Sequence, residues 1–156
     1  MKYFIWIFFF LLLNCKQEKN KIKDDEIIKI IYENNQIVNN ITDNFYILDN
    51  RFKEPGKHNL MMTSQEINII KKKIIKEEIF KLDDSLTFVE LCKRGCLSEI
   101  TIVYKSGRKQ HFIFDNYNYQ SNFSSDSYRR IISLEELIAQ IMMKKKFDPE
   151  PINVHF

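Results

Sequence analysis

The feature that most constrains the fold is an apolar stripe of helical period that follows residue 63. Thr63-Ser64-Gln65-Glu66 has the pattern of a capping box, in which a hydroxyl and a carboxylate each accept a hydrogen bond from a backbone amide. Apolar residues then recur mainly at steps of three and four, with Lys and Glu on the opposite face. The stripe comprises Ile67, Ile70, Ile74, Ile75, Ile79 and Leu82. This pattern predicts a helix from about Ser64 to Lys81 with one buried face.

A second helix is predicted near the C-terminus. Ser133-Leu134-Glu135-Glu136 repeats the capping-box pattern. The basic run Lys144 to Lys146 suits the negative end of a helix, and Pro149 stops it. The residues expected to face inward are Leu134, Leu137, Ile138, Ile141 and Met142.

Two segments between these helices alternate apolar with polar or smaller residues and predict a β-hairpin. Their apolar residues are Ile100, Ile102, Tyr104, Phe112 and Phe114. A two-residue Ser106-Gly107 turn would place Ile102 opposite His111 and scatter the apolar faces. A three-residue loop from Ser106 to Arg108, with Gly107 at positive φ, keeps the faces together. In that register, which we expect, Ile102 pairs with Phe112 and Ile100 with Phe114.

Four further segments are strand candidates, and together with the helices they predict the fold class. Glu26 to Tyr32 is rich in β-branched residues, and Phe45 to Leu48 precedes a Pro55-Gly56 turn. The others are Asn59 to Met62 and the alternating C-terminal residues Ile152, Val154 and Phe156. We expect a single α+β domain over residues 26–156. Its antiparallel sheet would have about four to six strands, with two amphipathic helices packed on one face.

The N-terminus carries an uninterrupted apolar run, Tyr3 to Leu13, behind a single cation, Lys2. A run of this length is too short to span a bilayer as a helix, which takes about 20 residues. It fits the apolar region of a secretory signal, roughly 7 to 15 residues. We therefore expect residues 1–14 to be a signal peptide that is removed. A short uncleaved membrane anchor and a buried N-terminal helix are the alternatives.

The run ends in Leu12-Leu13-Asn14-Cys15, which resembles the lipobox of bacterial lipoproteins. Members of that family have an apolar residue three positions before an obligatory Cys, as Leu12 stands before Cys15. Asn14 departs from the usual Gly, Ala or Ser before the cut. The resemblance covers about the first sixteen residues. It implies that Cys15 becomes residue one of the mature chain, with diacylglycerol on its sulfur and an acyl chain such as palmitate on its amino group. Because each buried methylene adds about 0.8 kcal/mol of membrane affinity, two or three chains would anchor the protein firmly.

Residues 15–25 are expected to be the lipidated Cys and a flexible tether. The segment after Cys15, KQEKNKIKDD, has a single apolar residue. In the lipoprotein family an Asp directly after the lipidated Cys favours the inner membrane, and here that residue is Lys16. The resemblance thus implies a cell-envelope protein held by lipid at the outer membrane. Gln17-Glu18 and Asp24-Asp25-Glu26 are similar to acidic surface-export signals, so the periplasmic and the surface face both stay open.

The charge balance argues against nucleic acid as a partner. The whole chain has 24 Lys and Arg against 21 Asp and Glu, for a net charge of +3. Loss of residues 1–14 removes only Lys2 and leaves the mature chain near +2. Nucleic-acid binding usually requires a strongly basic patch, whereas these lysines alternate with acids.

Cys92-Lys93-Arg94-Gly95-Cys96 brackets a short Gly-containing turn. Outside the cytoplasm, two such cysteines favour a disulfide between Cys92 and Cys96. Free buried thiols, and a metal or redox site, are the alternatives. The spacing is not the C-x-x-C of redox enzymes, and the histidines show no paired metal-ligand spacing. The histidines are His58, His111 and His155. We predict no metal and no cofactor.

Known catalytic motifs are absent from the sequence, which contains no G-x-S-x-G, no H-E-x-x-H and no Gly-rich phosphate loop. The adjacent acids Asp83-Asp84 are typical of a solvated helix end. We predict that the protein is not an enzyme. An active site built from distant residues would leave no such signal, and His111 or His155 in a cleft beside a carboxylate or Cys92 would favour one.

The segment from Asp115 to Arg130, DNYNYQSNFSSDSYRR, is the predicted working surface. Tyr, Ser, Asn and Arg together are typical of recognition surfaces, because rigid amphipathic rings give contact area at low entropy cost. The candidate partner-binding residues are Tyr117, Tyr119, Phe123, Tyr128, Arg129 and Arg130. The alternative is that Tyr117, Phe123 and Tyr128 cover an edge of the core.

These patterns favour a lipid-anchored cell-envelope protein that is a non-catalytic binding or assembly module. Its partner would be a protein or a glycan in the envelope, and the membrane would be contacted through the N-terminal lipid. An immunity or inhibitor lipoprotein that neutralises an envelope-acting toxin or hydrolase is the first alternative. A small periplasmic enzyme without a recognisable motif is the second.

Overall fold

The computed structural model describes residues 25–34, 37–90, 96–115, 121–145 and 152. These residues form one seven-stranded sheet, in the order β4-β3-β2-β1-β6-β7-β5. The strands are β1 (Ile27–Asn34), β2 (Ile37–Asn40), β3 (Phe45–Leu48), β4 (Gly56–Asn59), β5 (Ser85–Phe88), β6 (Leu97–Tyr104) and β7 (Lys109–Asp115). The helices are α2 (Ser64–Lys76), α3 (Asp126–Met143) and the short 3-10 turns η1 (Ile79–Lys81) and η2 (Ser121–Ser124).

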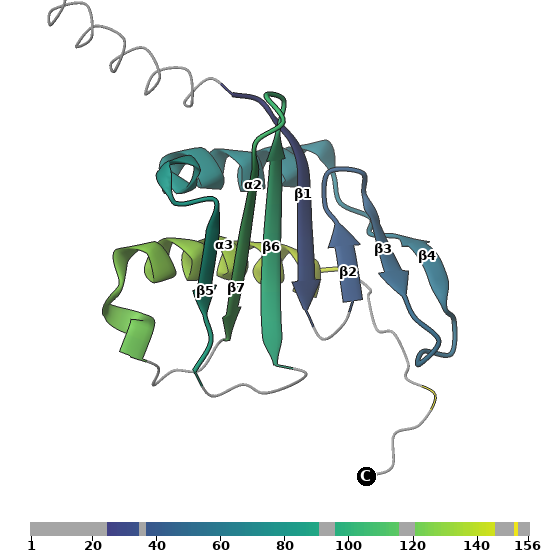
Figure 1. Cartoon of the computed structure of the whole chain (residues 1–156). Coiled ribbons are helices and arrows are strands. Elements are labelled where there is room, and N and C mark those ends of the chain that lie inside the picture. The colour runs from purple at the N-terminus through teal and green to yellow at the C-terminus, as the bar shows by residue number, and fades with distance from the viewer. Residues whose placement is uncertain (1–24, 35–36, 91–95, 116–120, 146–151, 153–156) are drawn as a thin grey trace, which may run out of the picture.

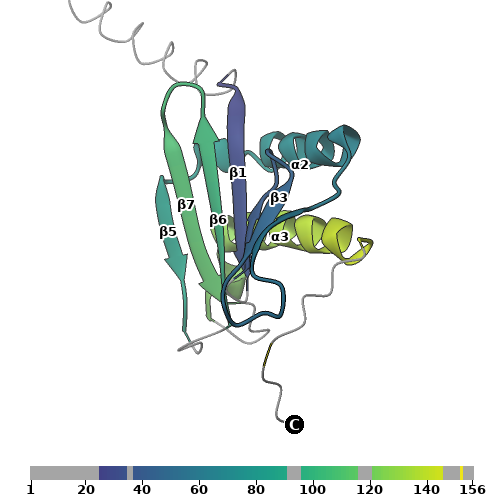
Figure 2. The ribbon, with the colours of Figure 1, turned by 90° about the vertical axis from the view of Figure 1, so that its right-hand side faces the viewer.

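Figures 1 and 2 show that α2 and α3 cover the same face of the sheet. All neighbouring strands are antiparallel except β5 and β7, which are parallel. The predicted α+β class, with two helices on one face, is confirmed. The seven strands slightly exceed the expected range, because β2, β4 and β5 have only four residues each, too few for a clear strand pattern in the sequence. In the described part of the chain, no helix is long and apolar enough to cross a membrane.

The core lies between the inner face of the sheet and the two helices. Ile100 and Phe112 from the sheet, Ile70 and Ile74 from α2, and Leu134 from α3 are fully buried together with their neighbours. Burial of each such side chain contributes about 1.5 to 3 kcal/mol. The apolar stripes recognised in the sequence therefore form the contact between the layers.

Helix α2 begins as predicted. The Thr63 hydroxyl accepts from the Glu66 amide at 3.2 Å, and Glu66 Oε2 accepts from the Thr63 amide at 2.7 Å. The helix ends at Lys76 rather than Lys81, because Glu78 adopts a left-handed conformation with φ 51° and ψ 33°. The chain then turns through η1, which buries Ile79, whereas Ile75 is 46% exposed and lies off the stripe.

The β6–β7 hairpin has the predicted faces but a different register. Its three-residue loop is Lys105 to Gly107, closed by a bond from the Tyr104 amide to the Arg108 carbonyl at 2.9 Å. Gly107 has the expected positive φ, 91°. Ile100 pairs with Phe112 and Ile102 with Gln110, so the expected pairing of Ile102 with Phe112 and of Ile100 with Phe114 is wrong by two residues. A shift of two residues leaves every side chain on the same face.

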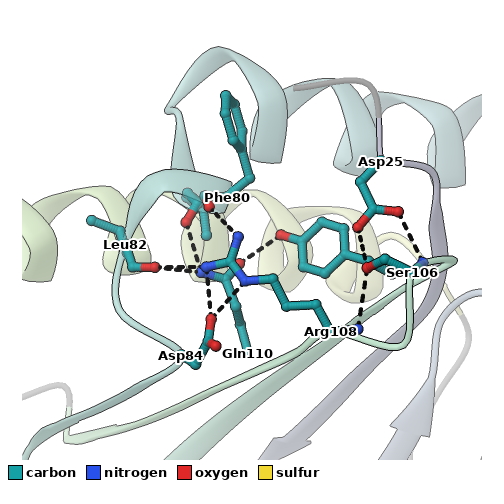
Figure 3. A network of polar contacts seen from close by, with 9 residues as sticks. Asp25, Phe80, Leu82, Asp84, Ser106, Arg108 and Gln110 are labelled. Atoms are coloured by element: carbon teal, nitrogen blue, oxygen red, sulfur yellow. Dashed lines mark hydrogen bonds and ion pairs between the residues drawn. The ribbon is translucent and has the colours of Figure 1, made fainter. Parts of the chain in front are cut away.

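Figure 3 shows the polar contacts that accompany this register. Gln110 is fully buried, and its amide donates to the carbonyls of Ile79 and Leu82 at 3.1 and 2.8 Å while it accepts from the Tyr104 hydroxyl at 2.6 Å. Arg108 donates to the Phe80 carbonyl at 2.6 Å, to the Leu82 carbonyl at 3.0 Å and to Asp84 at 2.7 Å. These bonds attach the carbonyls at the end of η1 to the hairpin.

Two predicted boundaries are wrong. Helix α3 begins at Asp126, with Ser125 as its N-cap, so Ser133 and Glu136 lie inside the helix. The helix extends toward the N-terminus because Tyr128 and Ile131 are also buried in the core. The segment Asn59 to Met62 is not a strand: β4 ends at Asn59, and Leu60 and Met62 are buried in the connection to α2. Of the predicted C-terminal strand only Ile152 is described, and the rest lies outside the described residues.

Candidate functional site

The structure removes one residue from the predicted working surface. Tyr128 is only 3% exposed, its ring packs edge-on against Phe88 with centroids 5.4 Å apart, and its hydroxyl donates to the Asp115 carbonyl at 3.0 Å. Tyr128 is therefore a core residue, and its assignment as partner-binding was wrong. Tyr117 and Tyr119 lie outside the described residues, as does the side chain of Phe123 in η2.

Arg129 and Arg130 lie on the first turns of α3, where both approach Asp126, at 3.6 and 2.6 Å. They line a groove of about 550 Å³ between the start of α3 and the end of α2. The other residues that line this groove are Lys76, Glu77, Glu78, Asp126 and Ser133. Because its three basic side chains face three acidic ones, the groove has no net charge to attract an ion of either sign.

The cysteine predictions stay predictions. Cys15 and Cys92 lie outside the described residues, and Cys96 is exposed directly before β6. His155 also lies outside, whereas His58 stacks on Tyr46 with ring centroids 5.0 Å apart. Within the described ranges, no group of three or more His, Cys, Asp or Glu side chains is placed to hold a metal ion.

The face of the sheet opposite the helices is not covered by any described element (Figure 2). At its centre, β1, β6 and β7 place their outward residues in three rows. We call these nine residues the outer sheet face: Lys29, Val103 and Lys109 in the row nearest the hairpin, then Ile31, Thr101 and His111, then Glu33, Glu99 and Ile113. All of them except the more exposed Lys109 are half-buried. Within these rows, aliphatic side chains are neighbours of ionisable ones.

Glu33 and Glu99, from the row farthest from the hairpin, form an ionisable cluster with His111 of the middle row. Glu33 is directly opposite Glu99 in the β1–β6 pairing, and His111 Nε2 lies 2.9 Å from Glu99 Oε2. Burial raises the pKa of Glu33, and the charge of Glu99 raises it further, whereas His111 lowers it. Like charges placed directly opposite on neighbouring strands destabilise a sheet, so this arrangement carries a structural cost.

A histidine at hydrogen-bond distance from a carboxylate is also a common part of general acid–base sites. The sequence criterion for an enzyme was His111 in a cleft beside a carboxylate. The carboxylate is present, but His111 lies on an open sheet face and lines neither the groove at Arg129 nor the cleft described next. His111 therefore meets the carboxylate part of that criterion but lies in neither of these two hollows.

A cleft of about 450 Å³ lies between β1, β2 and the last turns of α3. Beside it, the Tyr32 hydroxyl donates to Glu135 Oε1 at 2.7 Å and accepts from Asn34 Nδ2 at 2.8 Å. Both Tyr32 and Glu135 are buried. Burial, and then the charge of Glu135, raise the pKa of Tyr32 well above its usual range. The sequence pattern misses this pair, because it predicts a helix start at Ser133 and assigns Glu135 neither a place in the core nor a partner.

The chain matches no protein-family model, no curated protein and no solved structure. A functional assignment must therefore come from the geometry of the described residues and from the N-terminal sequence.

Proposed function

We propose that the protein is a lipid-anchored, non-catalytic binding module of the cell envelope, and that the outer sheet face binds its partner. The lipid is attached at Cys15, and the domain that follows is held at the membrane, as the N-terminal sequence predicts. One observation carries the proposal: the helices cover only one face of the sheet, and the other presents half-buried aliphatic side chains around Glu33 and Glu99.

The contacts of Asp25 and Glu26 support an orientation relative to the membrane. The Ser106 amide donates to Asp25 Oδ1 at 3.0 Å, and the Lys105 amide donates to the Glu26 carbonyl at 2.8 Å. The start of the folded domain is thus attached to the hairpin loop (Figures 1 and 3). A chain of the length of residues 16–24 reaches about 17 Å on the flexible-coil estimate. The hairpin would then be the membrane-proximal end, with the strands standing away from the bilayer.

The charges of the outer sheet face favour a partner with a basic group. Glu33 and Glu99 lie in the row farthest from the hairpin, and the pKa of Glu33 is raised in part by its neighbour's charge. A Lys or Arg side chain of the partner would relieve that repulsion, while Ile31, Val103 and Ile113 contact apolar surface around it. This combination suits a protein partner with an aliphatic surface and a cation opposite the row of Glu33 and Glu99.

A second copy of the chain fits less well than a different protein. Two copies on one membrane, with both hairpins toward the bilayer, would stack Glu33 and Glu99 of one on the same residues of the other. The antiparallel arrangement would match opposite charges. It would also separate the two hairpins by about the length of an eight-residue strand, roughly 27 Å, so one tether would have to be almost fully extended, well beyond its r.m.s. span of about 17 Å.

Site-directed crosslinking in cells tests this proposal. A photocrosslinking residue at Thr101 lies at the centre of the outer sheet face, directly opposite Ile31 and His111. We expect it to capture one envelope protein, and we expect Thr101→Arg to abolish affinity capture of that protein. Gln140→Arg adds the same side chain to the exposed surface of α3 and is the matched control.

Arg129→Ala tests the groove at the start of α3 as the alternative surface. Capture that survives Thr101→Arg but is lost in Arg129→Ala would contradict the assignment to the outer sheet face. Capture that survives both variants would place the partner surface elsewhere on the protein.

A further inference from the structure

We infer that the cleft between β1, β2 and the last turns of α3 binds a small neutral molecule. This molecule has an aliphatic body and an N–H or O–H group that donates a hydrogen bond to Asn39 Oδ1. This site goes beyond the proposed function, because it lies on the helix side of the sheet and involves no residue of the outer sheet face.

The inference rests on the side-chain amide of Asn39, which lines the cleft and is 1% exposed. Its Nδ2 donates to the carbonyls of Tyr32 and Ile37 at 3.1 and 3.3 Å. These two bonds determine the orientation of the amide, because the reversed amide would direct its oxygen at two carbonyl oxygens. Among the described residues, Asn39 Oδ1 is the one buried side-chain nitrogen or oxygen atom that has no hydrogen-bond partner. Nearly all such atoms in folded proteins are paired with protein, ordered water or a ligand.

The other polar groups around the cleft already have partners. The Tyr32 hydroxyl bonds to Glu135 and to Asn34. Lys145 Nζ donates to both carboxylate oxygens of Glu66 at 2.7 Å, which neutralises its charge. The remaining need is thus for a hydrogen-bond donor rather than an acceptor or an ion. This is the reason for a neutral ligand with an N–H or O–H group.

The aliphatic part of the ligand would contact the apolar residues that line the cleft. Ala139, Met142 and Met143 line it together with Ile37, and Met143 is 76% exposed. The volume of about 450 Å³ lies within the range of small-molecule sites, about 300 to 1,000 Å³. Asn39 Oδ1 is shielded from solvent without a ligand. Methionine side chains are unbranched and adapt readily, so they can move aside to admit a ligand without a change in the backbone.

A pair of matched amides tests the inference. The full chain, purified in detergent, is titrated by ligand-observed NMR with hexanamide, which has an N–H donor and an aliphatic tail. N,N-dimethylhexanamide has the same tail but no N–H. We expect saturable binding of hexanamide and about tenfold weaker binding of the dimethyl amide, the ordinary effect of one buried hydrogen bond.

Two variants locate the binding. Ala139→Leu fills the cleft from α3 and should reduce hexanamide binding more than tenfold, whereas Gln140→Leu adds the same side chain to the exposed face of the helix and should leave it unchanged. Equal binding of the two amides would show that Asn39 takes no donor from a ligand. Binding that persists in Ala139→Leu, or the absence of saturable hexanamide binding, would equally overturn the inference. The comparison of amides uses the parent protein, so it stands even where a variant folds poorly.

Discussion

Glu33 on β1 lies directly opposite Glu99 on β6, so two acidic residues are neighbours in the row of the outer sheet face that is farthest from the hairpin. The two residues come from strands that are distant in the sequence and neighbours in the sheet. His111 on β7 contacts only one of them, Glu99, at 2.9 Å. The repulsion between the two carboxylates is therefore only partly compensated within the described chain. A cation of the partner would have its most favourable electrostatic interaction with the outer sheet face at this row.

Glu33→Gln should stabilise the protein at neutral pH. The folded protein holds the pKa of Glu33 above its ordinary value, so ionisation of this group disfavours folding above that pKa. The variant should gain about 0.2 to 1 kcal/mol in the free energy of unfolding at pH 7. The gain should shrink as the pH falls through the raised pKa, because Glu33 is then protonated in the parent. Urea unfolding at pH 7 and pH 4 measures both values. Glu136→Gln makes the same substitution on the exposed face of α3 and is the matched control.

Glu66→Ala should destabilise the start of α2. Hydrogen bonds from Lys145 and from the Thr63 amide lower the pKa of Glu66 to about 2. Its contribution is present above the pKa of an unfolded Glu and is lost as the pH falls toward 2. We expect the variant to lose about 1 kcal/mol at pH 7, typical of a lost helix cap, and to differ little from the parent near pH 2. Chemical unfolding at several pH values tests this, with the exposed neighbour Gln65→Ala as the control. A loss that does not depend on pH would contradict the role of the charge.

Arg108→Lys should weaken the attachment of η1 to the hairpin. The guanidinium donates to two carbonyls and to Asp84, and a single ammonium group cannot reproduce this fork. We expect a loss of about 1.5 to 3 kcal/mol in the free energy of unfolding, measured by urea denaturation. Lys109→Arg, at the exposed neighbouring position, should be nearly neutral. Equal stability of Arg108→Lys and the parent would mean that these bonds contribute nothing net.

Cys15→Ser should release the protein from membranes and leave the uncleaved precursor. The proposed lipid needs a thiol to form its thioether, and in the lipoprotein family cleavage follows that modification. Cell fractionation and mass spectrometry of the purified chain measure both effects, with Lys19→Ser in the expected tether as the control. A Cys15→Ser variant found with the membrane fraction at mature size would refute the lipoprotein assignment.

Cys92 and Cys96 should be joined by a disulfide. If Cys15 carries lipid, the chain has two other cysteines, so thiol titration of unfolded protein should detect none without reductant and two with it. Closure of so short a loop should contribute about 2 kcal/mol on the chain-entropy estimate. Two reactive thiols in the absence of reductant would exclude the bond. Cys92→Ser should expose one thiol and confirm that the reagent reaches this region.

The sequence by itself determined those features that depend on local chemistry. The start of α2 was predicted because Thr63 and Glu66 satisfy backbone amides within one turn. The inward faces of β6 and β7 were predicted because alternation assigns a side chain to one side of a sheet. The positive φ of Gly107 followed from the conformation of a short hairpin loop.

Only the tertiary structure decided what depends on contacts between distant segments. Period-two alternation is compatible with any shift of the hairpin register by an even number of residues. In the register observed, buried Gln110 donates to the carbonyls of Ile79 and Leu82, at the two ends of the η1 turn. Helix α3 begins at Asp126 because the core has room for Tyr128. The opposition of Glu33 to Glu99 and the unpartnered oxygen of Asn39 arise from strand pairing and layer packing, and neither leaves a mark in the linear order of residues.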